Sequence, residues 1–350
     1  PMILTIVAAV IVFGVLIAVH EAGHLAAAKA VGVTVHEFAI GMGPKLCSFT
    51  KGGTRYSLRL LPIGGYCSME GEDESSDNSG ALCNKSPWAR MLVMVAGALM
   101  NILLGFLLYI LLYSCSGSVV STNIVDQVLP DTPAEAAGFE AGDKIIRVNG
   151  HRVHIPSELQ FEMYKAGYGE MELVLERDGQ RLTKTITPKL ETVEGKDADG
   201  NPVSYQQYLV GYQMKQAKNT VFTVLERAFY QCFLTVRLVL YSFVSIFRGQ
   251  VSFSDMSGPV GIVNEIGKSV QAGILDLISL TALIAVNLGV FNLLPFPALD
   301  GGRVFFLLVE LIRRKPIPPE REGIVHMVGM ALLLLLMIAV TYQDIVKLFT

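Results

Sequence analysis

The chain has 350 residues, of which 51% are hydrophobic and only 17% are charged, and its mean hydropathy is +0.47. Because a soluble chain carries roughly 25% charged residues, this chain has too few to cover soluble domains of its length, and its apolar content also excludes a disordered protein. The net charge of −3 provides no basic field, so we expect no nucleic-acid partner. The five cysteines are scattered and form neither a CxxC pair nor a disulfide framework.

Four apolar stretches are long enough to cross a bilayer, which takes about 20 residues of helix. They are residues 2–19, which continue through a polar cluster into a further apolar run, and residues 91–113, 273–299 and 324–342. The first stretch lacks a basic start and a small-residue cleavage site, so we interpret it as a span and not as a cleaved signal peptide. A fifth stretch, residues 221–247, contains three charged side chains, and we expect an amphipathic helix along the membrane surface.

These patterns predict a polytopic α-helical membrane protein with four transmembrane helices and divide the chain into four parts. Residues 1–115 hold the first two spans and, at 32–87, a Gly-rich alternating stretch that predicts a membrane-associated β-rich loop on the cytoplasmic side. Residues 116–218 predict an inserted α+β domain. Residues 219–271 form the interfacial segment, and residues 272–350 hold the last two spans.

Local patterns predict individual elements of the inserted domain and of the loop. Residues 172–187 are typical of two strands joined by an Asp-Gly turn. Residues 142–149 predict a strand, and residues 131–138 predict a short helix that ends at a glycine. A small α+β sandwich or barrel follows. In the β-rich loop, residues 70–79 are acidic and serine-rich, which predicts a mobile, solvated segment.

The first apolar stretch contains an HExxH pattern, formed by His20, Glu21 and His24. Positions i and i+4 of a helix share one face, so both imidazoles can bind one metal ion, and the adjacent carboxylate can take a proton from a metal-bound water. The pattern also occurs by chance on surface helices. In an apolar helix, however, a central charge costs roughly 2.5–3.5 kcal/mol, and a bound divalent metal would offset that cost.

A catalytic zinc site usually has a third protein ligand. Asp300 is the favoured one, because Pro295 and Pro297 break the helix before it, and broken backbone at membrane depth occurs only around a buried or watered cavity. Alternatively, Asp300 caps a helix that starts near Arg303, and the two roles are compatible. The polar candidates within the apolar stretches are Asn101, Asp276, Asn287, Asn292, Asp300 and His326.

The HExxH pattern, together with the distant Asn-x-x-Pro-x-Pro-x-Leu-Asp-Gly at residues 292–301, resembles the site-2 protease family of intramembrane metalloproteases. Residues 133–150 are similar to the core of the PDZ domains of bacterial proteases. A single such domain between the second and third spans resembles the branch that contains the sigma-E regulator protease, and residues 61–66 and 257–262 also match that branch. Ala98 stands where the family usually has proline, which puts only the local helix shape in question.

The resemblance implies one Zn²⁺ per chain, held by His20, His24 and Asp300, with Glu21 as the general base. It implies that the enzyme cleaves single-span membrane proteins in their transmembrane segments during regulated intramembrane proteolysis, for example anti-sigma factors or signal-peptide remnants. The resemblance also implies that Asn287 and Asn292 bind the substrate backbone, although hydrogen bonds between helices are an alternative role for both. A strand segment that contains Gly64 and Gly65 could pair with an unwound substrate, or it could be an ordinary hairpin of the loop.

The site sets a topology in a bacterial plasma membrane. One metal ion requires the ends of the first and third spans at the same depth, so residues 221–247 should not cross. A fifth crossing, which hydropathy alone favours, would leave the zinc one ligand short. The N-terminus, the PDZ-like domain and the C-terminus then face outwards and the active site lies towards the cytoplasm. This topology agrees with the positive-inside rule, because two groups of basic residues then face the cytoplasm. The group in or beside the loop after His24 is Lys29, Lys45, Lys51, Arg55, Arg59, Lys85 and Arg90. The group after Asp300 is Arg313, Arg314, Lys315 and Arg321.

Two other classes of function compete with the protease. The first is a metal-binding membrane transporter, which is disfavoured because the chain has no internal repeat. The second is a catalytically idle PDZ scaffold anchored in the membrane, which is disfavoured because all the expected catalytic positions are occupied by the required residue types.

Overall fold

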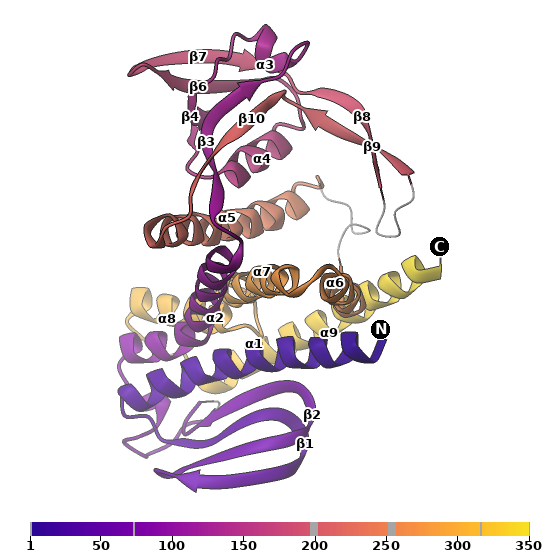
Figure 1. Ribbon diagram of the computed structural model, residues 1–350. Helices are drawn as coiled ribbons and strands as arrows, with labels where there is room; N and C mark the ends of the chain where they lie inside the picture. Colours follow the sequence, from indigo (N-terminus) through magenta and orange to yellow (C-terminus); the bar gives the residue numbers. More distant parts are fainter. Residues whose placement is uncertain (1, 73, 197–201, 251–256, 316, 350) are drawn as a thin grey trace. The chain divides into compact units, whose positions relative to one another are not determined.

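A computed structural model describes residues 2–72, 74–196, 202–250, 257–315 and 317–349 of the chain (Figure 1). The chain forms two compact units. The first combines Pro1–Leu112 with Thr235–Thr350, and the second is the inserted segment Tyr113–Leu234.

The first unit is built mainly from long apolar helices. The helices α1 (Met2–Ala30), α2 (Pro87–Cys115) and α9 (Pro319–Phe349) contain three of the predicted spans. Helix α7 (Ile274–Asn292) covers only residues 274–292 of the predicted span 273–299. Helix α5 (Val221–Phe247), whose part up to Leu234 belongs to the second unit, contains the fifth stretch. In the described part of the chain, these five are long and apolar enough to cross a membrane, by length and composition. Apolar side chains on α9 remain 63% exposed at Leu335 and 64% exposed at Ile338. Such faces suit contact with lipid and not with water.

Two shorter helices of this unit pack against the long ones. Helix α6 (Pro259–Ala272) shares a buried apolar cluster with α1 and α7, in which Leu16 and Ile266 are fully buried. Its N-terminus is fixed by Asp344 of α9, whose carboxylate accepts the backbone N–H groups of Gly258 at 3.1 Å and Gly261 at 2.8 Å. The Gly-rich motif at residues 257–262 thus lets α9 approach the start of α6. Helix α8 (Asp300–Arg313) follows the broken end of α7.

The predicted β-rich region is present as β1 (Val35–Lys51) and β2 (Thr54–Met69), joined by a Gly-Gly turn. Residues 37–40 pair with residues 55–58 on one side and with residues 65–68 on the other, so each long strand contributes two segments to the sheet. The pairs described for residues 65–69 are all with residues 35–40, which makes 65–69 an edge segment. An edge presents backbone N–H and C=O groups that can pair with another chain.

The segment between β2 and α2 contains a short 3₁₀ helix, η1 (Leu82–Asn84), and the acidic residues predicted to be solvated. That prediction needs correction at two positions. Glu70 accepts a hydrogen bond from Ser76 at 2.5 Å and contacts His36 at 2.6 Å, and these contacts lower the pKa of the Glu70 carboxyl. Glu72 forms an ion pair with Arg303 of α8 at 2.9 Å.

The second unit is an α+β domain, as the sequence predicts. Its main sheet has the order β10-β3-β4-β6-β7, with β5 beside β4, while β8 pairs with β9. Ile145, Leu173 and Leu175 are fully buried in its core. The elements are β3 (Val119–Val128), α3 (Pro133–Ala136), β4 (Lys144–Val148), β5 (His151–Arg152), α4 (Pro156–Lys165), β6 (Met171–Arg177), β7 (Gln180–Ile186), β8 (Lys189–Lys196), β9 (Pro202–Leu209) and β10 (Tyr212–Lys218).

The local predictions for this domain are confirmed. The Asp-Gly turn joins β6 to β7 with positive φ angles of 51° at Asp178 and 78° at Gly179, as a tight hairpin requires. The predicted strand is β4 and the predicted short helix is α3. A buried ion pair closes this region, because the Asp143 carboxylate accepts two hydrogen bonds from Arg177, at 2.6 and 2.8 Å.

Candidate metal centre

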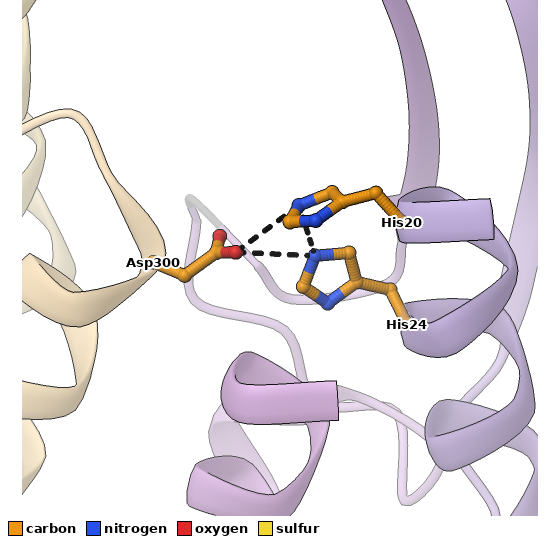
Figure 2. A group of neighbouring side chains, drawn as sticks. All are labelled: His20, His24 and Asp300. Atoms are coloured by element: carbon orange, nitrogen blue, oxygen red, sulfur yellow. Dashed lines mark hydrogen bonds and ion pairs between the residues drawn. The ribbon is translucent and has the colours of Figure 1, made fainter. Parts of the chain in front are cut away.

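Three side chains from two distant parts of the sequence converge on one point. His20 and His24 project from α1 one turn apart, and their Nε2 atoms lie 3.1 Å from each other. Oδ2 of Asp300, at the start of α8, lies 3.2 Å from Nε2 of His20 and 3.4 Å from Nε2 of His24 (Figure 2). The sequence prediction of His20, His24 and Asp300 as a cluster therefore agrees with the geometry.

The spacing of the three atoms fits a tetrahedral zinc site. Zinc bonds of about 2.0–2.1 Å to nitrogen or oxygen place neighbouring ligand atoms about 3.3 Å apart, close to the three separations in this cluster. In addition, Oδ2 of Asp300 is buried and accepts no hydrogen bond from the described residues. A buried carboxylate oxygen in that state is costly without a cation, so the donor set suits a bound divalent metal.

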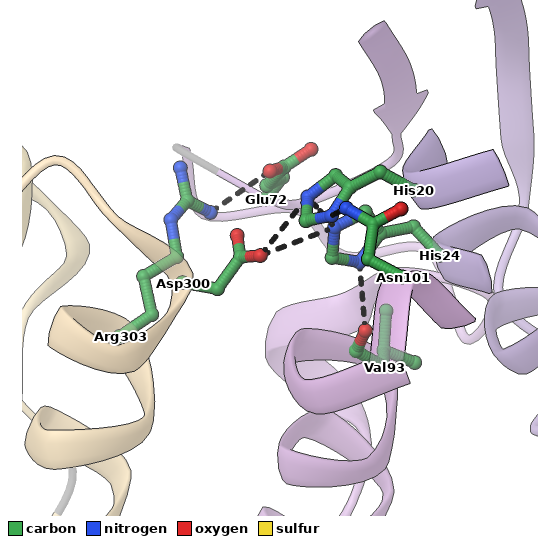
Figure 3. Close-up of polar contacts among 7 residues, drawn as sticks. All are labelled: His20, His24, Glu72, Val93, Asn101, Asp300 and Arg303. Carbon is green, nitrogen blue, oxygen red and sulfur yellow. Dashed lines mark hydrogen bonds and ion pairs between the residues drawn. The ribbon is translucent and has the colours of Figure 1, made fainter. Parts of the chain in front are cut away.

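Backbone and side-chain contacts from α2 orient both imidazoles. Nδ1 of His24 donates a hydrogen bond to the carbonyl of Val93 at 2.8 Å, which leaves the Nε2 lone pair directed at the cluster (Figure 3). The backbone of Gly97 lies against the same ring, and a Cβ atom there would fall 2.8 Å from its Cδ2 and Cε1 atoms. Gly23 allows α1 and α2 this close approach, since its Cβ would lie 2.5 Å from the carbonyl oxygen of Ala96.

Asn101 supports His20 from behind. Its side chain is fully buried, and its amide lies 3.2 Å from Nδ1 of His20 (Figure 3). An imidazole that binds metal through Nε2 carries its proton on Nδ1, so it needs an acceptor there. The amide oxygen of Asn101 provides that acceptor when the side-chain amide is turned by 180°, a rotation that also satisfies the buried oxygen.

The broken segment after α7 presents Asp300 to the histidines. The N-cap of α8 is Leu299, and Asp300 is the first helical residue, so the alternative interpretation of Asp300 as the cap of a helix starting near Arg303 is wrong. Gly301 and Gly302 allow α8 to begin against the preceding turn, because a Cβ on Gly302 would lie 2.5 Å from the Phe296 carbonyl oxygen. The two glycines of the motif are therefore needed for the close packing of α8 on the turn before it.

A cavity of about 380 Å³ opens at the cluster. Glu21 lines it next to the two histidines, and the edge segment 65–69 lines it from β2. Gly65 lies next to Glu21, since a Cβ at this position would lie 3.2 Å from Cγ of Glu21. The remaining lining residues are Glu72 and Met94. A carboxylate, a candidate metal site and a sheet edge thus line one cavity.

Comparison with known proteins agrees with this chemistry. The model of peptidase family M50 matches residues 8–336. The chain belongs to this family. It is 39% identical to a Clostridium perfringens protein named as a candidate zinc metalloprotease, over 97% of this chain and 98% of the relative. It is also 32% identical to zinc metalloprotease RasP of Oceanobacillus iheyensis, over 99% of both chains. A third relative, zinc metalloprotease RasP of Geobacillus kaustophilus, is 30% identical over 99% of this chain and 98% of its own.

Membership of the M50 family makes the chain a zinc metalloprotease of the site-2 protease type. It is a membrane protein whose cofactor is Zn²⁺, for which the His-His-Asp cluster is the candidate position. These findings favour the enzyme over the transporter and the idle scaffold that the sequence left as alternatives.

Three other predicted site residues of this M50 enzyme do not line the cavity at the cluster. Asn287 lies within α7 and Asn292 is its last residue, and neither lines the cavity at the histidines. Gly64 precedes the cavity-lining segment and lies against the side chain of Met42. Of the remaining third-ligand candidates, Asp276 lies in the first turn of α7.

Sequence reasoning missed several residues that shape the site. The carbonyl of Val93 and the backbone of Gly97 carry no chemical signature in a sequence, because any residue has a carbonyl and glycines are common in apolar helices. Glu72, paired with Arg303 at the cavity, was assigned to a solvated loop (Figure 3). The signal was present for Asn101, whose burial in an apolar helix required a partner, but its role behind His20 required the fold.

Proposed function

We propose that this M50 enzyme hydrolyses peptide bonds within the transmembrane segments of single-span membrane proteins, at a zinc ion held by His20, His24 and Asp300. The observation that supports this most is the shared cavity, in which the cluster, Glu21 and the edge segment 65–69 face one space. A transporter site would need a pathway through the protein, whereas a hydrolase needs a base beside the metal and a surface for an extended peptide.

A bound zinc ion supplies Lewis acidity, which lowers the pKa of a water molecule and polarises the scissile carbonyl. Glu21 takes a proton from the attacking water and returns it to the leaving amine. The backing of His24 by Val93 and of His20 by Asn101 holds both imidazoles in the tautomer that presents Nε2. These residues reduce the reorganisation that the reaction would otherwise require.

A substrate helix hides its carbonyls in its own hydrogen bonds, so it has to unwind before hydrolysis. We infer that the unwound segment adds to residues 65–69 as a further strand, next to residues 35–40. The inner edge of residues 65–69 is occupied by residues 35–40, and Gly65 brings the added strand beside Glu21 without a side chain in between. Asn287 and Asn292 remain candidates for binding the substrate backbone.

The placement of α5 supports four spans. Its first part, up to Leu234, belongs to the same compact unit as the inserted β domain. Arg227 donates a hydrogen bond to the Ser121 carbonyl of β3 at 2.8 Å, and Tyr230 stacks on His154 at 3.9 Å. The remainder, residues 235–247, would extend about 20 Å as a helix, which is less than the roughly 30 Å of a bilayer core. We therefore propose that α5 lies at the extracytoplasmic surface.

In the proposed topology, α1 and α7 run in the same direction and α2 returns the chain between them. The N-terminus, the inserted domain and the C-terminus face outwards, and the metal centre lies towards the cytoplasm of a bacterial plasma membrane. The inserted domain, residues 116–218, is proposed to be a PDZ-like domain that selects or filters substrates during regulated intramembrane proteolysis. Expressed alone, it should fold, because its apolar core is closed by its own strands and helices.

The decisive experiment uses Glu21→Gln in purified full-length protein in detergent. The variant should retain about one zinc per chain by elemental analysis, because Glu21 is not a ligand, and it should lose cleavage of a single-span test substrate. A Glu21→Gln protein that still cuts would overturn the proposed mechanism. Zinc flux into proteoliposomes that is independent of Glu21 would favour a transporter. Mass spectrometry of proteins trapped by this variant would identify natural substrates.

A further inference from the structure

His326 is one of the residues that the sequence offered as a third metal ligand, but the structure gives it a different contact. Its Nδ1 accepts a hydrogen bond from the backbone N–H of Ala298 at 2.9 Å. Ala298 lies two residues before Asp300 and has a φ of 79°, in the left-handed region that alanine rarely adopts. The imidazole therefore accepts a hydrogen bond from the residue with left-handed backbone in the turn that presents Asp300.

The protonation of this imidazole follows from the contact. A backbone N–H is always a donor, so Nδ1 of His326 is the unprotonated nitrogen and Nε2 carries the proton. Nε2 faces Oε1 of Glu322 at 3.7 Å, one helical turn earlier on α9. The ring also packs on Phe306 of α8, with 5.9 Å between the ring centroids. Contacts from both helices thus fix the orientation of the acceptor, whose side chain is only 14% exposed.

Helix α9 touches the same turn at a second point. A Cβ atom on Gly329 would lie 2.7 Å from the carbonyl carbon of Pro297, so the helix backbone packs directly on the turn. Gly329 and His326 are three residues apart and share one face of α9. Backbone packing brings α9 to the turn. The hydrogen bond from the Ala298 N–H to His326 is the side-chain contact that favours the left-handed conformation of Ala298.

We propose that His326 is a positioning residue, which stabilises the left-handed turn at Ala298 and so fixes Asp300 in the geometry that zinc requires. This inference rests on the proposed function, since it needs Asp300 to be a ligand. Side chains that orient metal ligands from behind typically change metal affinity by about tenfold to a hundredfold when they are removed, and that is the expected range here.

Two substitutions at His326 separate the hydrogen bond from simple packing. His326→Leu fills a similar volume without an acceptor, whereas His326→Asn loses volume but keeps an acceptor oxygen on Cγ, where Nδ1 of histidine is attached. The readout is the zinc dissociation constant of the full-length protein in detergent, measured by competition with a chromophoric chelator. We expect about tenfold weaker binding or more for His326→Leu and recovery of most of that loss in His326→Asn. Leu335→Ala, on the exposed face of α9, is the control and should bind as wild type.

A third variant tests the turn itself. Glycine adopts positive φ freely, so Ala298→Gly introduced into His326→Leu should recover zinc affinity. Wild-type affinity in His326→Leu, or an Asn variant no better than the Leu variant, would overturn the proposal. If His326→Leu does not yield folded protein, the double variant decides the question: folded protein with recovered affinity supports the proposal, and its absence rejects it.

A parallel Asp300→Asn measurement distinguishes this inference from the proposed function. If Asp300→Asn binds zinc as tightly as wild type, the ligand assignment itself fails. If Asp300→Asn loses zinc while His326→Leu keeps it, the ligand assignment stands and only the role of His326 is rejected.

Discussion

The backbone of Gly97 on α2 lies against the imidazole of His24 on α1, with no room for a side chain between them. We expect Gly97→Ala to displace the ring from the cluster and to weaken zinc binding by about tenfold or more, as loss of ligand orientation does. Zinc competition in purified protein measures the effect. Gly14→Ala on α1 is a matched control, because a Cβ there meets no atom within 4 Å. Equal affinities in both variants would show that the ring tolerates the methyl group.

Asn101 should matter to zinc through His20. Asn101→Leu removes the acceptor behind Nδ1 while leaving all three proposed ligands in place, so we expect about tenfold to a hundredfold weaker zinc binding. Leu99→Ala on the same helix, at a side chain 50% exposed, should leave the affinity unchanged. Isothermal titration of metal-free protein with zinc provides the comparison. Wild-type affinity in Asn101→Leu would limit Asn101 to helix packing.

Gly65 should affect turnover without affecting zinc. A Cβ at this position would lie 2.9 Å from Cγ2 of Ile17 and 3.2 Å from Cγ of Glu21, so Gly65→Ala displaces Glu21, the proposed general base, by a few tenths of an ångström. A misplacement of about 1 Å can reduce kcat about a hundredfold, so we expect a smaller but measurable loss of kcat in Gly65→Ala. Cleavage kinetics and zinc content are measured together, with Ser48→Ala on an exposed strand segment as control. If Gly65→Ala loses zinc as well as activity, Gly65 does not act only on the position of Glu21 and of the substrate strand, and the prediction is wrong.

The inserted domain should lose stability in acid through Asp143. Burial alone raises the pKa of this carboxyl, but hydrogen bonds from Arg177 and from the Glu140 backbone N–H outweigh it and lower the pKa below its usual value. The stabilisation is therefore complete above the unfolded-state pKa of about 3.9 and is lost as pH falls through the lower folded-state pKa. Asp143→Asn should destabilise the domain at pH 7 by about 1–3 kcal/mol.

Hydrogen exchange of the β6 and β7 amides in the full-length protein, followed from pH 7 down to pH 3, measures this effect. The difference between wild type and Asp143→Asn should shrink towards the acid end. A difference that stays constant over this range would mean that packing, and not the charge of Asp143, carries the contribution. Glu191→Gln, at an exposed pair with Lys189, serves as the control.

The proposed surface position of α5 predicts which cysteine probes react in intact cells. After replacement of the native cysteines, single cysteines at Asn219 and Gln250, which flank α5, should both react with a membrane-impermeant reagent added outside. The reason is that a helix along the surface leaves both of its ends on one side. Reaction at Asn219 alone, with Gln250 labelled only after lysis, would show a fifth crossing and would also remove Asp300 from the zinc site.

Several features of this protein are local and could be predicted from the sequence. The HExxH spacing places His20 and His24 on one helix face whatever surrounds the helix. The apolar stretches form the helices α1, α2, α5, α7 and α9, because apolar segments of this length in a membrane protein satisfy their backbone hydrogen bonds as helices. The turn between β6 and β7 is also local, because a two-residue hairpin turn requires positive φ at both residues and Asp-Gly adopts it readily. Asp300 could be singled out because prolines and glycines interrupt an apolar helix around it.

What the tertiary structure decided depends on contacts between segments distant in sequence. Six polar residues were chemically acceptable as a third ligand, and only the packing of α8 against the broken end of α7 brings Asp300 to the histidines. Packing of α2 against α1 places Asn101 behind His20, and packing of α9 against the turn before α8 places His326 at Ala298. Strand register made residues 65–69 an edge beside Glu21, and an ion pair fixed Glu72 at the cavity. Residue type states which contacts are possible, whereas burial and backbone approach between helices select the ones that form.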